Sequence, residues 1–258
     1  MGVSAAVFGG RHALCGYSNG EYKNIISINY CLWIFFWAQK KGEYVTVKDY
    51  EKFEVWLQYG TPDGEMGDES EYPIAGCREV LAKIAKKIKK TKAESVLCIG
   101  AGSEIIAREL YKDGRDVWIV DILSFDEAHM ADLEAEMPEA HFLNYDFLEE
   151  MPEELDGLSF DAIACSYLLH IVGEEEKLVL IEELANMLSL YGTLYIGDVC
   201  FWTSAEHEIC RRRCGESWDD EANYFVYDDF AKLFNSIYGE GHISFLRISH
   251  CAGIIQIS

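Results

Sequence analysis

The strongest constraint on this chain is a short apolar run that ends in two closely spaced glycines. Val96–Ile99 is followed by Gly100 and Gly102, and a second apolar run, Val117–Val120, ends at Asp121. The pattern predicts a buried strand, a glycine turn, a helix and a second strand that ends in a carboxylate. Such a turn lets a nucleotide-like ligand approach the backbone, and an acid 19 residues after Gly102 can accept hydrogen bonds from a ribose diol.

Strand and helix patterns alternate from residue 95 onward. The expected strands are Val96–Ile99, Val117–Val120, His141–Leu143, Phe160–Cys165 and Thr193–Ile196, and the expected helices include 75–90, 127–136, 177–188 and 227–237. Two final apolar runs, Ile243–Ile248 and Gly253–Ile257, are joined by a connection too short for a parallel return. We therefore expect an α/β fold with a Rossmann-like, seven-stranded, mainly parallel sheet, a C-terminal antiparallel hairpin, and helices on both faces.

The first 48 residues differ in character from the remainder. Their apolar run Ile25–Ala38 is interrupted by Ser27 and Asn29, and it is too short for a bilayer, which needs roughly 20 apolar residues. We expect residues 1–48 to form an N-terminal extension and residues 49–258 to form one domain. For the extension three roles stay open: an element packed on the domain, a lid, and a contact between two subunits of a homodimer.

The charge balance disfavours some classes of binding partner. The formal net charge is −23, from 22 basic and 45 acidic residues, which disfavours nucleic acid because phosphate binding depends on Lys and Arg. Residues 116–176 hold 18 acids and no Lys or Arg. A solvated acidic surface explains this stretch, and attraction of a cationic ligand is the alternative.

The nine cysteines form no C-x-x-C pair and follow no secretory leader, so we expect reduced thiols in a cytoplasmic protein. His207, Cys210 and Cys214 have a spacing that could place three metal ligands on one helix face. Cysteine commonly packs as a small core residue and no fourth ligand is evident, so we predict no metal site.

Several segments resemble, in the right order, those of class I S-adenosylmethionine-dependent methyltransferases over roughly residues 48–258. The likeness rests on Val96–Glu104, Asp121, Asn144–Phe147 and Phe160–His170, and Leu190–Asp198 looks like the fifth strand of that fold with its preceding glycine turn. A narrower group, small and mostly uncharacterised bacterial methyltransferase homologues, is similar at Tyr50–Trp56, Glu71–Gly76, Trp218–Phe230 and His250–Ile255.

The resemblance implies S-adenosyl-L-methionine as the cofactor and assigns part of its site to the first two strands. Gly100, Ala101 and Gly102 would pass under the methionine portion. Asp121 would hold both ribose hydroxyls, and Ile122 would lie against the adenine face. An acid that caps a loop is the alternative for Asp121.

The resemblance also implies roles further along the chain. Asp146 would accept a hydrogen bond from the exocyclic amine of adenine, and the Phe147 amide would donate to a ring nitrogen. Ser166 and Tyr167 would face the methyl donor at the carboxyl end of the fourth strand. Tyr72 would close over the methionine end, with a packed surface tyrosine as the alternative.

The activity implied by the resemblance is methyl transfer to an O, N or S atom of a small-molecule acceptor. The cofactor supplies the leaving group, so the protein mainly aligns the reactants and excludes water. If the acceptor must lose a proton, His170 is the candidate base; packing at a helix start is the alternative. Arg211, Arg212, Arg213 and Trp218 could shape the acceptor pocket; an exposed helical charge run is the alternative for the arginines.

Two residues depart from the methyltransferase pattern. Cys98 stands where an acid usually precedes the first glycine, and Glu104 stands where the last glycine of the turn usually lies. These departures keep a second hypothesis open, a catalytically impaired methyltransferase-like module that serves binding or assembly. A nicotinamide oxidoreductase is disfavoured, because its turn would carry glycine at Ile105 and the terminal hairpin does not suit that class.

Overall fold

The computed structural model describes residues 71–121, 127–144 and 152–258. The N-terminal extension at 1–48 lies outside these residues. Its separation from the domain that begins at residue 49, and its role as a lid or a dimer contact, therefore stay predictions.

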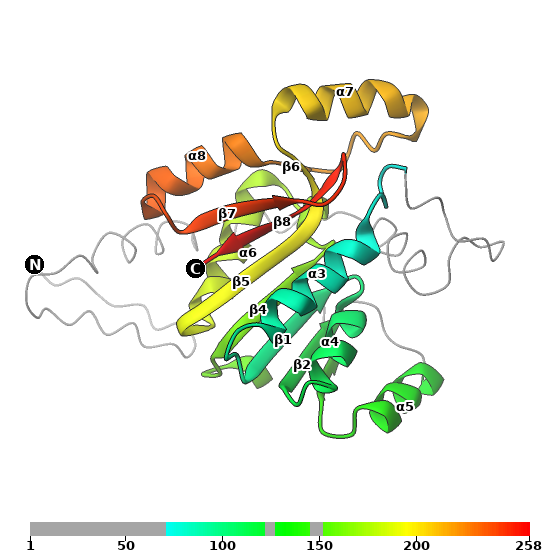
Figure 1. Ribbon diagram of the computed structural model, residues 1–258, viewed down its shortest axis with the longest axis vertical. Helices are drawn as coiled ribbons and strands as arrows, with labels where there is room; N and C mark the ends of the chain where they lie inside the picture. The colour runs from blue at the N-terminus through cyan, green and yellow to red at the C-terminus, as the bar shows by residue number, and fades with distance from the viewer. Residues whose placement is uncertain (1–70, 122–126, 145–151) are drawn as a thin grey trace, which may run out of the picture. The chain divides into compact units, whose positions relative to one another are not determined.

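The described residues form an α/β fold around one twisted sheet (Figure 1). The strand order is β3-β2-β1-β4-β5-β8-β7. Strands β1 to β5 run parallel, and β8 pairs antiparallel with both β5 and β7. The predicted fold class, with its mainly parallel sheet and C-terminal hairpin, is confirmed. The bounds are β1 Ser95–Gly100, β2 Asp116–Asp121, β3 His141–Asn144, β4 Phe160–Ser166, β5 Leu188–Phe201, β7 Ile243–Arg247 and β8 Ala252–Ile257.

The structure differs from the sequence prediction around the fifth strand. β5 is longer than Thr193–Ile196 at both ends, and its far end pairs with a two-residue strand that was not predicted, β6 Phe225–Val226. The near end escaped prediction because Gly192 indicates a turn before the strand, whereas β5 continues through it from Leu188. The far end escaped because Asp198 interrupts the apolar pattern, although it is buried.

Helices cover both faces of the sheet. Figure 1 shows α3 (Cys77–Lys89) and α4 (Ser103–Tyr111) in front of the strands and α6 (Glu174–Asn186) behind them. α6 begins three residues earlier than predicted, at three glutamates that suit the positive end of a helix dipole. The remaining helices are α5 Glu127–Glu136, α7 Ser204–Cys214 and α8 Tyr227–Tyr238, with short 3-10 turns at Glu153–Leu155, Leu169–Ile171 and Gly215–Ser217.

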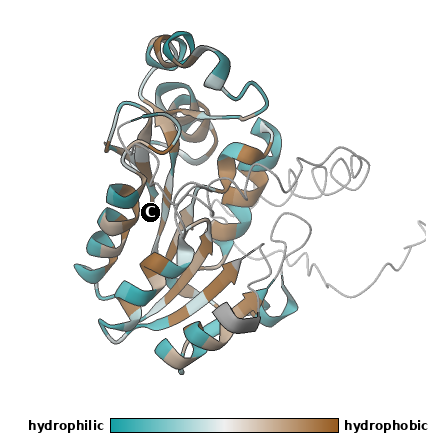
Figure 2. Ribbon diagram, turned by 90° about the vertical axis from the view of Figure 1, so that its right-hand side faces the viewer, coloured by the Kyte–Doolittle hydropathy of each residue, from teal (hydrophilic) through white to brown (hydrophobic). Residues whose placement is uncertain are grey.

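The core lies between the sheet and these helices. Strands β1 and β4 are buried along almost their whole length, as expected for central parallel strands covered on both faces. Figure 2 shows these central strands mainly in the colour of hydrophobic residues. In the described part of the chain every cysteine is a free thiol, and none of the helices there is long and apolar enough to cross a membrane.

A glycine in β5 sets how closely α3 approaches the sheet. A Cβ atom at Gly197 would lie 2.5 Å from Val80 Cγ1 and 2.7 Å from Ile84 Cδ1. Val80 and Ile84 are fully buried on the inner face of α3, and the branched side chain of valine has little freedom to move aside. The helix therefore lies on the sheet at a depth that only glycine at this position permits.

We predict that Gly197→Ala lowers the free energy of unfolding by about 1–3 kcal/mol, because the added methyl overpacks the contact between α3 and β5. Urea unfolding of the full chain measures this change. The control is Ser244→Ala at an exposed position of β7, which should stay within about 0.5 kcal/mol of wild type. Equal stability of both variants would show that α3 is free to move outward.

Candidate functional site

Three neighbouring strands bring predicted site residues into one row. β2 ends at Asp121, β1 at Gly100 and β4 at Ser166. In the parallel register, Gly100 pairs with Ser166, and Ile99 pairs with Val120, the residue before Asp121. The carboxyl ends of parallel strands are where open α/β sheets bind ligands. The backbone therefore places the glycine turn between a strand that ends in an acid and a strand that ends in a hydroxyl.

Gly100 is required by the shape of this turn. Its φ is +87°, a left-handed conformation that favours glycine. A Cβ atom here would lie 2.2 Å from the backbone oxygen of Ser166 and 3.1 Å from Leu168 Cβ. The turn and the segment after β4 thus approach each other through the space that a side chain would fill.

The hydroxyl of Ser166 ties the turn to β4. It is fully buried and donates a hydrogen bond of 2.8 Å to the carbonyl oxygen of Ala101. Tyr167 follows with φ +47°, an uncommon value for a residue with a side chain, and its N–H donates to Gly197 O at 2.8 Å. Ser166 and Tyr167 lie beside the turn, and the Ser166 hydroxyl bonds to protein. Their contact with the methyl donor stays a prediction.

The turn leads directly into the N-terminus of α4. Gly102, with φ +75°, precedes the helix, and Ser103 is its first residue. The Ser103 hydroxyl is fully buried and has no hydrogen-bond partner within the described ranges. The first amides of a helix and its dipole favour an anionic group at this position.

Glu104 does not leave an unbalanced charge at this helix end. Its carboxylate is buried and pairs with Arg108 at 2.9 Å, one turn further along α4. Arg108 in turn donates to Glu136 of α5 at 2.7 Å. Cys98, the other departure, is fully buried in β1, and burial raises the pKa of its thiol well above the ordinary value, so it stays neutral.

Part of the predicted adenosine site lies outside the described residues. Ile122, Asp146 and Phe147 fall in this category, and of Asp121 the structure describes the backbone alone. Their assigned contacts with the ribose and the adenine stay predictions.

A buried carboxylate on β5 organises the segment after β4. One oxygen of Asp198 accepts hydrogen bonds from the backbone N–H groups of Leu169 and His170, both at 3.1 Å. The other accepts from the Val199 N–H at 2.7 Å and lies 2.8 Å from Nδ1 of His170. Because Nδ1 faces a carboxylate, it carries the ring proton and leaves Nε2 as the basic nitrogen.

The main chain of Asn223 connects His170 to a second buried polar group. The Asn223 N–H donates to the carbonyl of His170 at 2.7 Å, and its own carbonyl accepts from the ammonium of Lys177. Lys177 is 5% exposed and lies 4.4 Å from the centre of the Phe225 ring. Burial lowers the pKa of Lys177 to about 8, while nearby Asp198 opposes this shift.

Tyr72 lies in an aromatic cluster with Trp218 and Tyr224. Its ring stacks on Trp218 with centroids 4.8 Å apart, and its hydroxyl bonds to that of Tyr224 and accepts from the Asp219 N–H at 3.1 Å. Burial raises the pKa of Tyr72 to about 12. The Tyr224 ring lies 6.1 Å from that of His170, so the cluster reaches the segment after β4. The predicted closure of Tyr72 over the methionine end stays a prediction.

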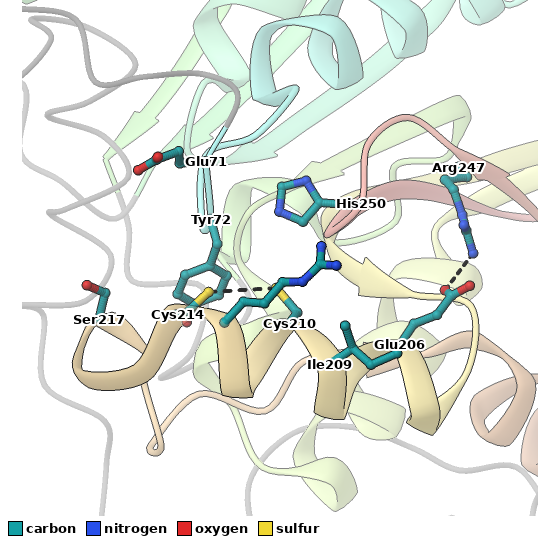
Figure 3. A pocket seen from close by; sticks show the side chains of 10 residues that line it. Glu71, Tyr72, Glu206, Ile209, Cys210, Cys214, Ser217, Arg247 and His250 are labelled. Carbon is teal, nitrogen blue, oxygen red and sulfur yellow. Dashed lines mark hydrogen bonds and ion pairs between the residues drawn. The ribbon is translucent and has the colours of Figure 1, made fainter.

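A hollow of about 750 Å³ is lined in part by Tyr72 (Figure 3). It lies between residues 71–72, one face of α7 and the turn between β7 and β8, and we call it the α7 hollow. Of the three predicted pocket arginines, Arg211 pairs with Asp220 and Arg212 with Glu208, whereas Arg213 lines the hollow. Cys210 and Cys214 line it as well, and none of the described residues forms a group of three that could hold a metal.

Sequence reasoning missed the residues that hold His170 in place. Asp198, Lys177 and Asn223 received no role, although Asp198 shares a sequence signal with Asp121, since both are acids at the end of an apolar run. That signal is weak because an acid after a strand more often faces solvent. Asn223 contributes only backbone atoms, which no side-chain pattern can mark.

Comparison with known proteins relates part of this chain to a family. Residues 97–196 match the family described as methyltransferase domain. This match spans β1 to the middle of β5 and so contains Gly100, Asp121, Ser166 and His170. A search of curated proteins finds no match.

Solved structures with the same fold include several methyltransferases. A candidate O-methyltransferase from Nostoc punctiforme shares 14% identity at a TM-score of 0.56, over 79% of this chain and 59% of its own length. The N-methyltransferase NodS from Bradyrhizobium japonicum, solved with S-adenosyl-L-homocysteine, shares 12% at 0.50, over 81% and 96%. A 1,6-didemethyltoxoflavin-N1-methyltransferase from Burkholderia thailandensis shares 16% at 0.51, over 93% and 92%. At these identities the likeness concerns the fold, and this chain spans about three fifths of the first of them.

We predict that Asp198→Asn lowers the free energy of unfolding by about 2–4 kcal/mol, because the amide nitrogen must face two buried N–H donors. Urea unfolding measures the loss. Asp220→Asn is the matched control: its side chain is 71% exposed, so its change should stay within about 0.5 kcal/mol. If the two variants unfold alike, Asp198 does not hold the segment after β4.

Proposed function

Since the chain carries a class I methyltransferase domain, we propose that it transfers a methyl group from S-adenosyl-L-methionine to an O, N or S atom of a small-molecule acceptor. The observation that carries this proposal is the row of Asp121, Gly100 and Ser166 at the carboxyl ends of three adjacent strands. In that row Gly102 carries no side chain that would keep a ligand from the backbone, and the acid stands one strand away from the turn.

The described residues suit the methionine end of this cofactor. Gly100 and Gly102 adopt left-handed conformations that keep side chains out of the turn. The N-terminus of α4 suits a carboxylate, and the buried Ser103 hydroxyl can donate a further hydrogen bond. Arg108 balances the charge of Glu104, which would otherwise repel that carboxylate.

When bound, the cofactor supplies a methyl group on a sulfonium sulfur, a leaving group that needs no acid. The residues of the chain then have two tasks. The turn and Asp121 hold the donor, and His170 accepts a proton at Nε2 from acceptors that must lose one. Asp198 acts as a positioning residue, because its hydrogen bonds set both the backbone and the ring of His170.

A small acceptor in the cytoplasm is part of the proposal. The net charge of −23 disfavours nucleic acid as the acceptor. The fold accommodates small acceptors, since the Burkholderia thailandensis enzyme was solved with 1,6-didemethyltoxoflavin bound.

We expect S-adenosylhomocysteine to bind the wild-type chain and to bind Gly100→Ala at least about tenfold more weakly, because the new methyl collides with the Ser166 backbone and displaces the turn. Isothermal titration calorimetry measures both affinities. Gly114→Ala is the matched control, since Gly114 also has a left-handed φ of +82° but nothing lies within 4 Å of its Cβ position.

Circular dichroism shows whether each variant folds, and Gly102→Ala replaces Gly100→Ala if the latter does not. The absence of wild-type binding at millimolar ligand would refute the proposed cofactor. Equal loss in the Gly114 control would refute the assignment of the glycine turn.

The alternative, a catalytically impaired module, depends on Cys98 and Glu104. If the chain is an active methyltransferase, we expect Glu104→Gly to change the affinity for S-adenosylhomocysteine by less than about threefold. The reason is that the Glu104 carboxylate is already paired with Arg108 of α4. Calorimetry on Glu104→Gly and on the Cys98→Asp, Glu104→Gly double variant decides between the two. A sharp gain in affinity would favour the impaired module.

A further inference from the structure

The α7 hollow contains none of the residues assigned to the methyl donor except the ring of Tyr72 at its wall. Its lining comes mainly from α7 and from the turn between β7 and β8 (Figure 3). Its volume of about 750 Å³ lies within the range of sites for small molecules, roughly 300–1,000 Å³. The question is which chemistry its lining would recognise.

The three consecutive arginines of α7 differ in what they contact. Arg211 donates to Asp220 at 2.6 Å, and Arg212 lies 3.4 Å from Glu208. Arg213 forms neither a hydrogen bond nor an ion pair with any residue in the described ranges, and it lines the hollow. Arg213 is exposed, so its guanidinium is accessible to a ligand in the hollow.

Among the described residues, none of the other charged groups that line the hollow forms an ion pair with Arg213. Arg247 and Glu206 form an ion pair of 2.5 Å at one end, so they neutralise each other. Figure 3 shows the Glu71 carboxylate pointing away from His250, whose ring extends over α7 from the β7–β8 turn. Besides the ion pair and the Glu71 carboxylate, the polar side chains that line the hollow include Arg213, His250 and Ser217.

Part of the lining is apolar. It consists of Ile209, Cys210 and Cys214 from α7 and the ring of Tyr72. Ile209 is 45% exposed, which leaves a large apolar side chain open to solvent at this site. Burial raises the pKa of the Cys210 thiol to about 12, so this thiol is neutral and does not repel an anion.

We propose that the α7 hollow is a binding site for a small anionic molecule with a flat apolar body, such as an aryl carboxylate or an aryl phosphate. The anionic group binds Arg213, whose planar guanidinium fits both carboxylate and phosphate in a two-point contact. His250 donates a further hydrogen bond, and the apolar body lies on Ile209, Cys214 and the Tyr72 ring. The site does not depend on the methyl donor.

The test uses the full chain and three probes: benzoate, phenyl phosphate and the neutral benzamide. Calorimetry or ligand-observed NMR should show binding of at least one anion and at least about tenfold weaker binding of benzamide. The stronger of the two anions identifies the preferred head group. Failure of both anions to bind at millimolar concentration would overturn the proposal.

The arginine triplet offers matched control variants. Arg213→Ala should weaken anion binding by at least about tenfold, and Arg213→Lys should recover only part of it, because an ammonium makes no two-point contact. Arg211→Ala and Arg212→Ala remove the same charge from the same helix and should leave affinity within about twofold. If all three alanine variants lose binding equally, the effect is general charge and the assigned site is wrong.

Alkylation of Cys214 locates the bound probe. This thiol is half-buried and lines the hollow, so occupancy should slow its reaction with iodoacetamide, as followed by peptide mass spectrometry. Protection should be lost in Arg213→Ala and kept in Arg211→Ala. Binding of the probe without protection of Cys214 would place it elsewhere and refute the proposal.

Discussion

The carboxylate of Asp198 is the interaction on which the geometry of the site depends. It lies near the end of β5, yet its partners belong largely to the segment that follows β4, two positions of the chain that only the parallel sheet brings together. Strand pairing thus stops at Ser166, and side-chain hydrogen bonds continue the connection for a few more residues. Such an arrangement stabilises only when all donors are satisfied, because a buried carboxylate that loses one partner keeps the full cost of desolvation. His170 is held at both its backbone and its ring for this reason.

The sequence supported prediction of the sheet better than of the site. A buried strand such as Val96–Ile99 is marked by consecutive apolar residues, so it can be recognised from the sequence alone. The glycines at 100 and 102 were also predictable, since few residues other than glycine adopt the backbone that such turns require. In contrast, the network around Asp198 and Asn223 joins residues that are distant in sequence, partly through main-chain atoms. The length of β5 was unpredictable for a related reason, because strand pairing extends it through Gly192, which resembles a turn residue, and through the charged Asp198.

The departures at Cys98 and Glu104 have different physical consequences. A neutral thiol in the middle of a buried strand is compatible with the core, and it lacks the charge that the methyltransferase pattern leads us to expect there. Glu104 introduces a charge, but α4 supplies its own counterion one turn away, and α5 extends the ion pairs through Glu136. The change at Cys98 therefore removes a charge that a ligand could contact, whereas the charge of Glu104 is balanced within the protein.

α3 lies so close to β5 that the residues on the two sides of this contact limit each other's size. Tyr72 lies just ahead of α3, and it contributes both to the aromatic cluster beside His170 and to the wall of the α7 hollow. Residue sizes at Gly197 and Val80 are thus coupled: a gain at one position demands a reduction at the other if Tyr72 is to keep its place. Homologues with a larger residue at position 197 should accordingly have smaller residues in the first turns of α3. Exchanging these core residues would alter ligand selectivity although none of them binds the ligand.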